Sequence, residues 1–235
     1  MPRVVEMTRA REGGPLRLAL PRGALWTETL DALDRIGIDT AGLRSDSRSL
    51  VFESGGLTLV TMRPSDVPTY VEAGAADLGI TGKDVLLEQR DRIVYEVLDL
   101  RYGACRMVLA GRAGDSALDE DERRLGAMRI ATKYPRVAER HFEETGRRAE
   151  VIEVKGSVEL APLSGLADGI VDLVATGRTL ADNGLEVREE IATSTARLIA
   201  NRVSHKLRAA EVDDLVERLR PEGRPAPGRE AEEAG

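Results

Sequence analysis

The chain has 235 residues, 42% of them hydrophobic and 32% charged, which is the balance of a globular protein with one large core or two smaller ones. Its net charge of -7 argues against nucleic acid as a partner, because phosphate backbones are bound by basic surfaces. The single cysteine, Cys105, excludes a disulfide framework, and no apolar run reaches the ~20 residues of a membrane span. Since residues 1–15 also contain no signal-peptide core, we expect a cytoplasmic protein without membrane partners.

The first half of the chain alternates short strands with amphipathic helices. A strand is predicted at 16–20, followed by a helix at 25–36 whose apolar residues lie three or four positions apart. Gly55 and Gly56 separate two further apolar runs, SLVFES and LTLVTM, and the loop RPSD then leads into a short helix. This alternation is typical of an α/β fold with mainly parallel strands.

The second half repeats that plan. Strands are predicted at 129–132 and 150–154, and each runs into a basic loop and a helix. Residues 193–203 have strand character and are expected to lead back to the first half, where a final helix packs. Two matched α/β lobes indicate a clamshell with its ligand in the cleft between them.

These elements predict the domain organisation. We expect a disordered lead-in at 1–15, lobe I at 16–103, lobe II at 104–192, a return to lobe I at 193–220, and a disordered tail at 221–235.

One ten-residue pattern, G-x-x-D-L-x-x-T-G-[KR], occurs at Gly74–Lys83 and again at Gly169–Arg178. In the second copy a buried strand runs into Thr176-Gly177-Arg178-Thr179 and then into a helix. Gly177 allows a tight turn, and the unpaired amides of the helix start favour a phosphate. A plain strand–turn–helix corner with a threonine cap also explains an isolated Thr-Gly.

Asp172 interrupts the apolar run IVDLVA just before this turn. A buried carboxylate without a partner is costly, so the residue needs an explanation. It either accepts hydrogen bonds from a ribose diol beside the phosphate or caps a neighbouring helix, and the sequence favours neither.

Cations also gather where the predicted strands end. The positions concerned are Arg22, Arg63, Lys83, Lys133, Lys155 and Arg178. Loops commonly carry charge, but six matched positions in an acidic protein favour a polyanion site. His141 and His205 lack ligand partners at metal spacing, and Cys105 is expected to lie in the core.

The segment KGSVELAPLSGLADGIVDLVATGRTLADNGL closely resembles the signature of the ATP phosphoribosyltransferase family. LALPRGAL, DVPTYVEAGAADLGITGKDVLLE and RIATKYPRVAERHF resemble its other hallmark segments in the same order, over about residues 16–203. Where that family commonly has lysine and arginine in the first of these, this chain has Arg22 and Ala24.

The resemblance implies a fold like type II periplasmic binding proteins and a reaction that joins N1 of ATP to C1 of phosphoribosyl pyrophosphate. It implies that Ala175, Thr176, Gly177, Arg178 and Thr179 cradle the 5-phosphate. The pyrophosphate would carry Mg²⁺, without a dedicated protein metal site.

It also implies roles for the remaining candidates. Asp172 and Asp168 would hold the ribose hydroxyls, with Glu159 near the sugar. Arg22, Arg48 and Arg63 would stabilise the departing pyrophosphate. Lys83 and Asp84 would help to place ATP.

The chain resembles the short form of the family, because no room remains after 203 for a regulatory carboxy-terminal domain. Short forms assemble around a homodimeric core with a regulatory subunit that resembles histidyl-tRNA synthetase. The alternative is a non-catalytic cytoplasmic clamshell that binds an anionic metabolite, which would also have doubled lobes and basic loops.

Overall fold

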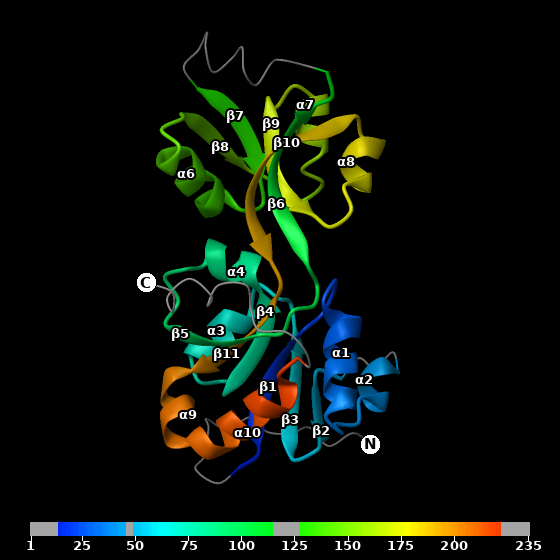
Figure 1. Cartoon of the computed structure of the whole chain (residues 1–235), viewed down its shortest axis with the longest axis vertical. Helices are drawn as coiled ribbons and strands as arrows, with labels where there is room; N and C mark the ends of the chain where they lie inside the picture. The colour runs from blue at the N-terminus through cyan, green and yellow to red at the C-terminus, as the bar shows by residue number, and fades with distance from the viewer. Residues whose placement is uncertain (1–13, 46–48, 115–126, 222–235) are drawn as a thin grey trace, which may run out of the picture.

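The structure is a computed structural model that describes residues 14–45, 49–114 and 127–221. Most of the predicted lead-in, Arg48 and the predicted tail from 222 onwards lie outside the described residues. The described chain forms two lobes, joined by two strand crossings at the waist of the molecule (Figure 1). No helix in the described part is long and apolar enough to cross a membrane.

Lobe I, the lower lobe in Figure 1, is built on a sheet of order β2-β3-β1-β4-β11-β5. Its strands are β1 (Leu16–Pro21), β2 (Val51–Ser54), β3 (Leu57–Met62), β4 (Leu78–Gly82), β5 (Val94–Asp99) and β11 (Ala196–Asn201). Its helices are α1 (Trp26–Arg35), α2 (Ala41–Arg44), α3 (Val67–Glu72), α4 (Lys83–Glu88), α9 (Arg202–Leu207) and α10 (Ala209–Leu219).

Lobe II has a sheet of order β10-β6-β9-β7-β8. Its strands are β6 (Cys105–Arg112), β7 (Met128–Thr132), β8 (Ala149–Glu153), β9 (Gly169–Val174) and β10 (Leu185–Ser194). Its helices are α6 (Pro135–Glu144), α7 (Leu160–Leu163) and α8 (Arg178–Asp182).

Successive side chains of the central strands point to opposite faces of each sheet, and helices cover both faces. In lobe I, Leu18 packs with α1 and α10, whereas Ala19 packs with α3. In lobe II, Ile130 packs with α6, whereas Ala131 packs with α7 and α8. The apolar residues between sheet and helices are buried in both lobes. Because such cores are closely packed, each lobe holds the loops at its strand ends in defined positions.

The two-lobed α/β fold is as predicted, but the sheets are mixed rather than mainly parallel. Parallel pairing is confined to β3-β1-β4 and β8-β7-β9. β11 returns from lobe II and lies antiparallel to β4, and β6 arrives from lobe I and lies antiparallel to β9. In each lobe, the strand that arrives from the other lobe runs opposite to its neighbours. This places antiparallel pairs beside the three parallel strands.

The order β3-β1-β4-β11-β5 in lobe I therefore matches β8-β7-β9-β6-β10 in lobe II. The two crossings lie side by side, because Ala196 N donates to Tyr102 O at 2.9 Å and Leu100 N donates to Ala196 O at 2.9 Å. They form a double-stranded hinge.

The repeated G-x-x-D-L-x-x-T-G pattern is not the structural repeat. Asp77 N donates to Arg17 O, and Asp168 N donates to Arg129 O, at the same point of the two sheets. Each aspartate accepts in return from the N–H of its arginine, at 2.8 Å in both lobes. The counterpart of Asp77 is therefore Asp168, not Asp172 as the letters suggest, and the two Thr-Gly sequences occupy different places in their lobes.

Candidate active site between the lobes

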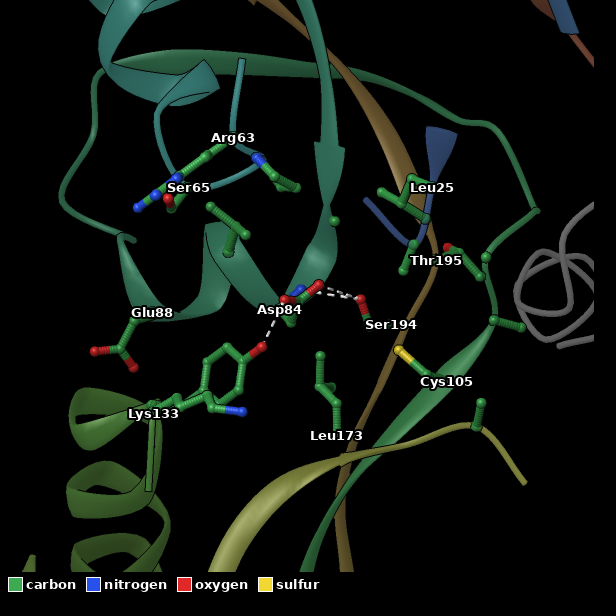
Figure 2. Close-up of a pocket in the computed structure, with 18 of the residues that line it drawn as sticks. Leu25, Arg63, Ser65, Asp84, Glu88, Cys105, Lys133, Leu173, Ser194 and Thr195 are labelled. Atoms are coloured by element: carbon green, nitrogen blue, oxygen red, sulfur yellow. Dashed lines mark hydrogen bonds between the residues drawn. The ribbon is translucent and has the colours of Figure 1, made fainter. Parts of the chain in front are cut away.

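A cavity of about 820 Å³ lies between the lobes. Lobe I contributes Arg63 and the first residues of α4, lobe II contributes Lys133, Tyr134 and Leu173, and the hinge contributes Gly103–Cys105 with Ser194 and Thr195 (Figure 2). Cavities of this size and position commonly hold nucleotide-sized ligands.

Asp84 joins both lobes and the hinge at this cavity. Its carboxylate accepts from Ser194 Oγ at 2.9 Å and from the Tyr134 hydroxyl at 3.2 Å, and its N–H donates to Ser194 Oγ at 3.0 Å (Figure 2). Gly82 makes this possible, because a Cβ there would overlap the Asp84 carboxylate. Burial, and then the Asp84 charge, raise the pKa of Tyr134, so its hydroxyl stays protonated and donates.

A second polar group lies at the end of β9. Asp172 is largely buried, accepts from Leu173 N at 2.9 Å, and has Lys133 Nζ at 4.0 Å. Burial raises its pKa, the charge of Glu159 adds to this, and Lys133 opposes it. Asp172 is thus a carboxylate with weak compensation, as expected of a group that accepts hydrogen bonds from a ligand.

The phosphate loop predicted after β9 is an open turn. Gly177 has φ 81° and ψ -4°, the left-handed conformation that glycine adopts without strain. Thr176, Arg178 and Thr179 are exposed, and Ala175 lines the cavity. In the first copy, by contrast, Gly82 is extended and Thr81 is buried with its hydroxyl donating to Pro64 O at 2.9 Å. Only the second Thr-Gly offers an accessible turn.

Two of the predicted arginines lie on neighbouring loops of lobe I. Arg63 is exposed and lines the cavity. Arg22 N donates to Met62 O at 2.8 Å, its Nε donates to Thr61 Oγ1 at 3.1 Å, and its guanidinium lies 4.9 Å from the Trp26 ring centroid. Both therefore end at the same edge of the sheet.

Two other candidates lie elsewhere. Lys83 Nζ pairs with Glu96 on β5 at 2.7 Å and does not line the cavity. Asp168 precedes β9, at the opposite end of that strand from the turn, and both its oxygens are bound by Arg129. The prediction that Asp168 holds ribose hydroxyls disagrees with this position, because a strand length separates it from the cavity.

Sequence reasoning missed several residues of the cavity. Tyr134 directly follows a singled-out lysine, and Ser194 and Glu88 carry no motif of their own. Cys105, predicted to lie in the core, is half-buried and lines the cavity, and burial raises the pKa of its thiol.

Comparisons with known proteins identify the family of the chain. Residues 63–221 match the family model HisG, described as ATP phosphoribosyltransferase. The ATP phosphoribosyltransferase of Rubrobacter xylanophilus is 53% identical over 91% of this chain and 99% of its own length. That of Caldanaerobacter subterraneus is 47% identical over 86% of this chain and 95% of its own.

Two solved structures are also similar. The ATP phosphoribosyl transferase (HisG:HisZ) complex from Thermotoga maritima matches with TM-score 0.74 and 37% identity, over 87% of this chain and 96% of the other. The periplasmic aliphatic sulphonate binding protein SsuA from Escherichia coli matches with TM-score 0.57 over 88% of this chain and 71% of its own, and at 12% identity it shows the two-lobed fold alone. From the family model and these relatives, the chain belongs to the ATP phosphoribosyltransferase family.

Proposed function

We propose that the cavity between the lobes binds phosphoribosyl pyrophosphate and ATP side by side, so that N1 of adenine can attack C1 of the ribose and release pyrophosphate. This is the first step of histidine biosynthesis, and we place it in the cytoplasm. The observation that carries the proposal is the cavity between the lobes, which Lys133, Leu173 and Ala175 line from lobe II and Arg63 lines from lobe I. Asp172 and the Gly177 turn directly adjoin Leu173 and Ala175 in the chain.

Lobe II would hold the sugar phosphate. The turn Ala175–Thr179 presents backbone amides and two threonine hydroxyls to the 5-phosphate, and Arg178 adds charge. Asp172 would accept hydrogen bonds from the ribose hydroxyls, and these bonds would stabilise its buried carboxylate. Glu159 would contribute through the effect of its charge on Asp172. We assign Asp168 to the frame of the lobe, with Arg129.

Lobe I would stabilise the departing pyrophosphate. Arg63, with Arg22 beside it, is placed to meet negative charge as it develops, and Arg48 is a further candidate outside the described residues. Mg²⁺ in such sites retains several waters and is bound by substrate phosphates and one or two carboxylates. We therefore expect it to enter the site bound to the pyrophosphate. Asp172 and Glu159, on the side proposed for the sugar, would accept from its waters.

ATP would occupy the remaining space against α4. The apolar walls Leu25, Val85 and Leu173 suit a purine ring, and Asp84 offers a fixed acceptor. Lys83 would act on the nucleotide only after leaving Glu96.

We further propose that the two lobes, divided at 103/104 and at 192/193, move about the hinge as units. The Thermotoga maritima structure is a complex of HisG with HisZ, and we propose a partner of that kind for this chain, around a homodimeric core.

The test is an absorbance assay of adenine substitution with both substrates, Mg²⁺ and pyrophosphatase. We expect turnover, alone or with the partner added, and a loss of about 100-fold in kcat for Arg63→Ala. Arg90→Ala, at an exposed arginine of the same lobe, is the matched control and should be unaffected. A chain that binds phosphoribosyl pyrophosphate but stays silent with the partner present would be the non-catalytic clamshell.

A further inference from the structure

The start of helix α6 in lobe II is capped by a side chain of lobe I. Glu88, the last residue of α4, accepts from Arg136 N at 3.1 Å and from Val137 N at 3.0 Å. These are the second and third residues of α6, whose amides no helical carbonyl can satisfy. Tyr134 holds the cap position of α6, but its side chain makes no hydrogen bond to the helix start.

This contact joins the lobes at the edge of the cavity. Pro135 begins α6 and has no N–H, so the two amides bound by Glu88 are the first that the helix offers. A carboxylate that takes both also meets the positive end of the helix dipole. Glu88 thereby fixes where α6 begins relative to lobe I.

The two residues just before α6 are Lys133 and Tyr134, which line the cavity. Tyr134 donates to Asp84, the second residue of the same α4 that ends in Glu88. One short helix of lobe I thus contacts the Lys133–Tyr134 loop at one end and the start of α6 at the other. Lys133 Nζ in turn lies 4.0 Å from the Asp172 carboxylate. A shift of α6 would therefore also move Lys133 on the side of the site proposed for the sugar.

We propose that Glu88 is a positioning residue: by capping α6 across the cleft, it holds the lobes at the separation at which Lys133 and Tyr134 face the substrates. It acts through α6 and not by contact with the reacting atoms. Glu88 lies across the cavity from the hinge residues Cys105, Ser194 and Thr195 (Figure 2), and its contact with α6 would break and re-form as the lobes open and close.

Two neighbouring contacts of the same interface are weaker. Arg140 Nη2 donates to Leu87 O at 3.2 Å, and Arg136 Nη1 pairs with Asp91 at 3.3 Å. The Asp91 side chain is 81% exposed, so that ion pair adds little to lobe closure. Asp91→Asn is therefore a matched control: it removes an interlobe ion pair but leaves the cap.

The experiment measures lobe separation and turnover in parallel, on the full chain. Spin labels at the exposed positions Thr27 and Glu150, with Cys105 replaced by serine, report the distance between the lobes without substrate. We expect Glu88→Ala to lengthen and broaden that distance and, in the unlabelled protein, to lower kcat/KM by about tenfold or more, the usual effect of losing a charge-assisted hydrogen bond. Glu88→Gln keeps one acceptor oxygen and should fall between, while Asp91→Asn should match the wild type in both.

If Glu88→Ala does not fold, Glu88→Gln carries the test. An unchanged lobe distance in the variants overturns the proposal: with reduced turnover it would mean that Glu88 contacts substrate directly, and with normal turnover that the cap is only structural. The turnover arm rests on the proposed function. A wild type that stays silent with the partner present would refute that function, whereas the distance arm would still decide the role of Glu88.

Discussion

The Tyr134 hydroxyl of lobe II lies 3.2 Å from the Asp84 carboxylate of lobe I, across the cavity that both lobes line. Asp84 also holds Ser194 of the hinge strand β10. A single carboxylate therefore connects the two halves of the site and the segment about which they would move. Its hydrogen bonds depend on the angle between the lobes.

Tyr134→Phe removes this connection but keeps the aromatic ring. Because a hydrogen bond to a charged group is commonly worth about 1.5–3 kcal/mol, we expect kcat/KM to fall by about 10- to 100-fold. Tyr70→Phe, at an exposed tyrosine of lobe I outside the cavity, should leave steady-state kinetics unchanged. Equal kinetics for both variants would show that the Tyr134 hydroxyl has no part in the reaction.

Asp172→Asn should abolish most activity without weakening the fold. Burial raises the pKa of Asp172, so its ionised form is disfavoured in the folded state, and the folded protein gains stability as pH falls through that raised pKa. Asparagine removes this cost and can still accept from Leu173 N. Thermal unfolding at neutral pH should show a Tm at or above that of the wild type, together with a large rise in KM for phosphoribosyl pyrophosphate.

The same shift predicts a pH dependence of the reaction. Asp172 must be ionised to accept from the ribose hydroxyls, so kcat/KM should decline on the acid side at a higher pH than an ordinary aspartate would give. The measurement is kcat/KM for phosphoribosyl pyrophosphate against pH. An acid limb that persists unchanged in the residual activity of Asp172→Asn would assign it to another group.

The sequence was sufficient to predict the lobes, the turn after β9 and the cations at strand ends, because those follow from local periodicity, glycine placement and charge. The sequence was misleading where identical residues adopt different backbone conformations. Thr81-Gly82 and Thr176-Gly177 read alike, yet one is buried and extended and the other is an exposed turn. Contacts between residues far apart in the chain, such as Asp84 with Tyr134 or Glu88 with α6, leave no local pattern at all.

Asp168→Asn tests whether Asp168 has a structural role, distinct from the ligand-binding role proposed for Asp172. The Asp168 side chain is 6% exposed and binds both the backbone and the guanidinium of Arg129. Its loss should lower the free energy of unfolding by about 1–3 kcal/mol, measured in urea, while kcat/KM of the folded enzyme stays within about twofold. A large loss of activity with unchanged stability would instead return Asp168 to the ribose, as the resemblance to the family implied.

Gly177→Ala tests the phosphate turn against a glycine of equal strain. Gly177 and Gly165 both have positive φ, 81° and 75°, and an added Cβ meets only Val174 at 3.8 Å at the first and nothing within 4 Å at the second. Either alanine variant should therefore lose about 1–2 kcal/mol of stability for its left-handed backbone. Gly165 follows α7, and its carbonyl accepts from Arg129, which also binds Asp168 at the opposite end of β9 from the turn, so Gly165→Ala should retain normal kinetics. Gly177→Ala should raise KM for phosphoribosyl pyrophosphate at least about tenfold, because the strained turn no longer aims its amides at the 5-phosphate. If both variants lose stability alike and neither changes KM, the turn after β9 is a plain corner and the sugar phosphate binds elsewhere.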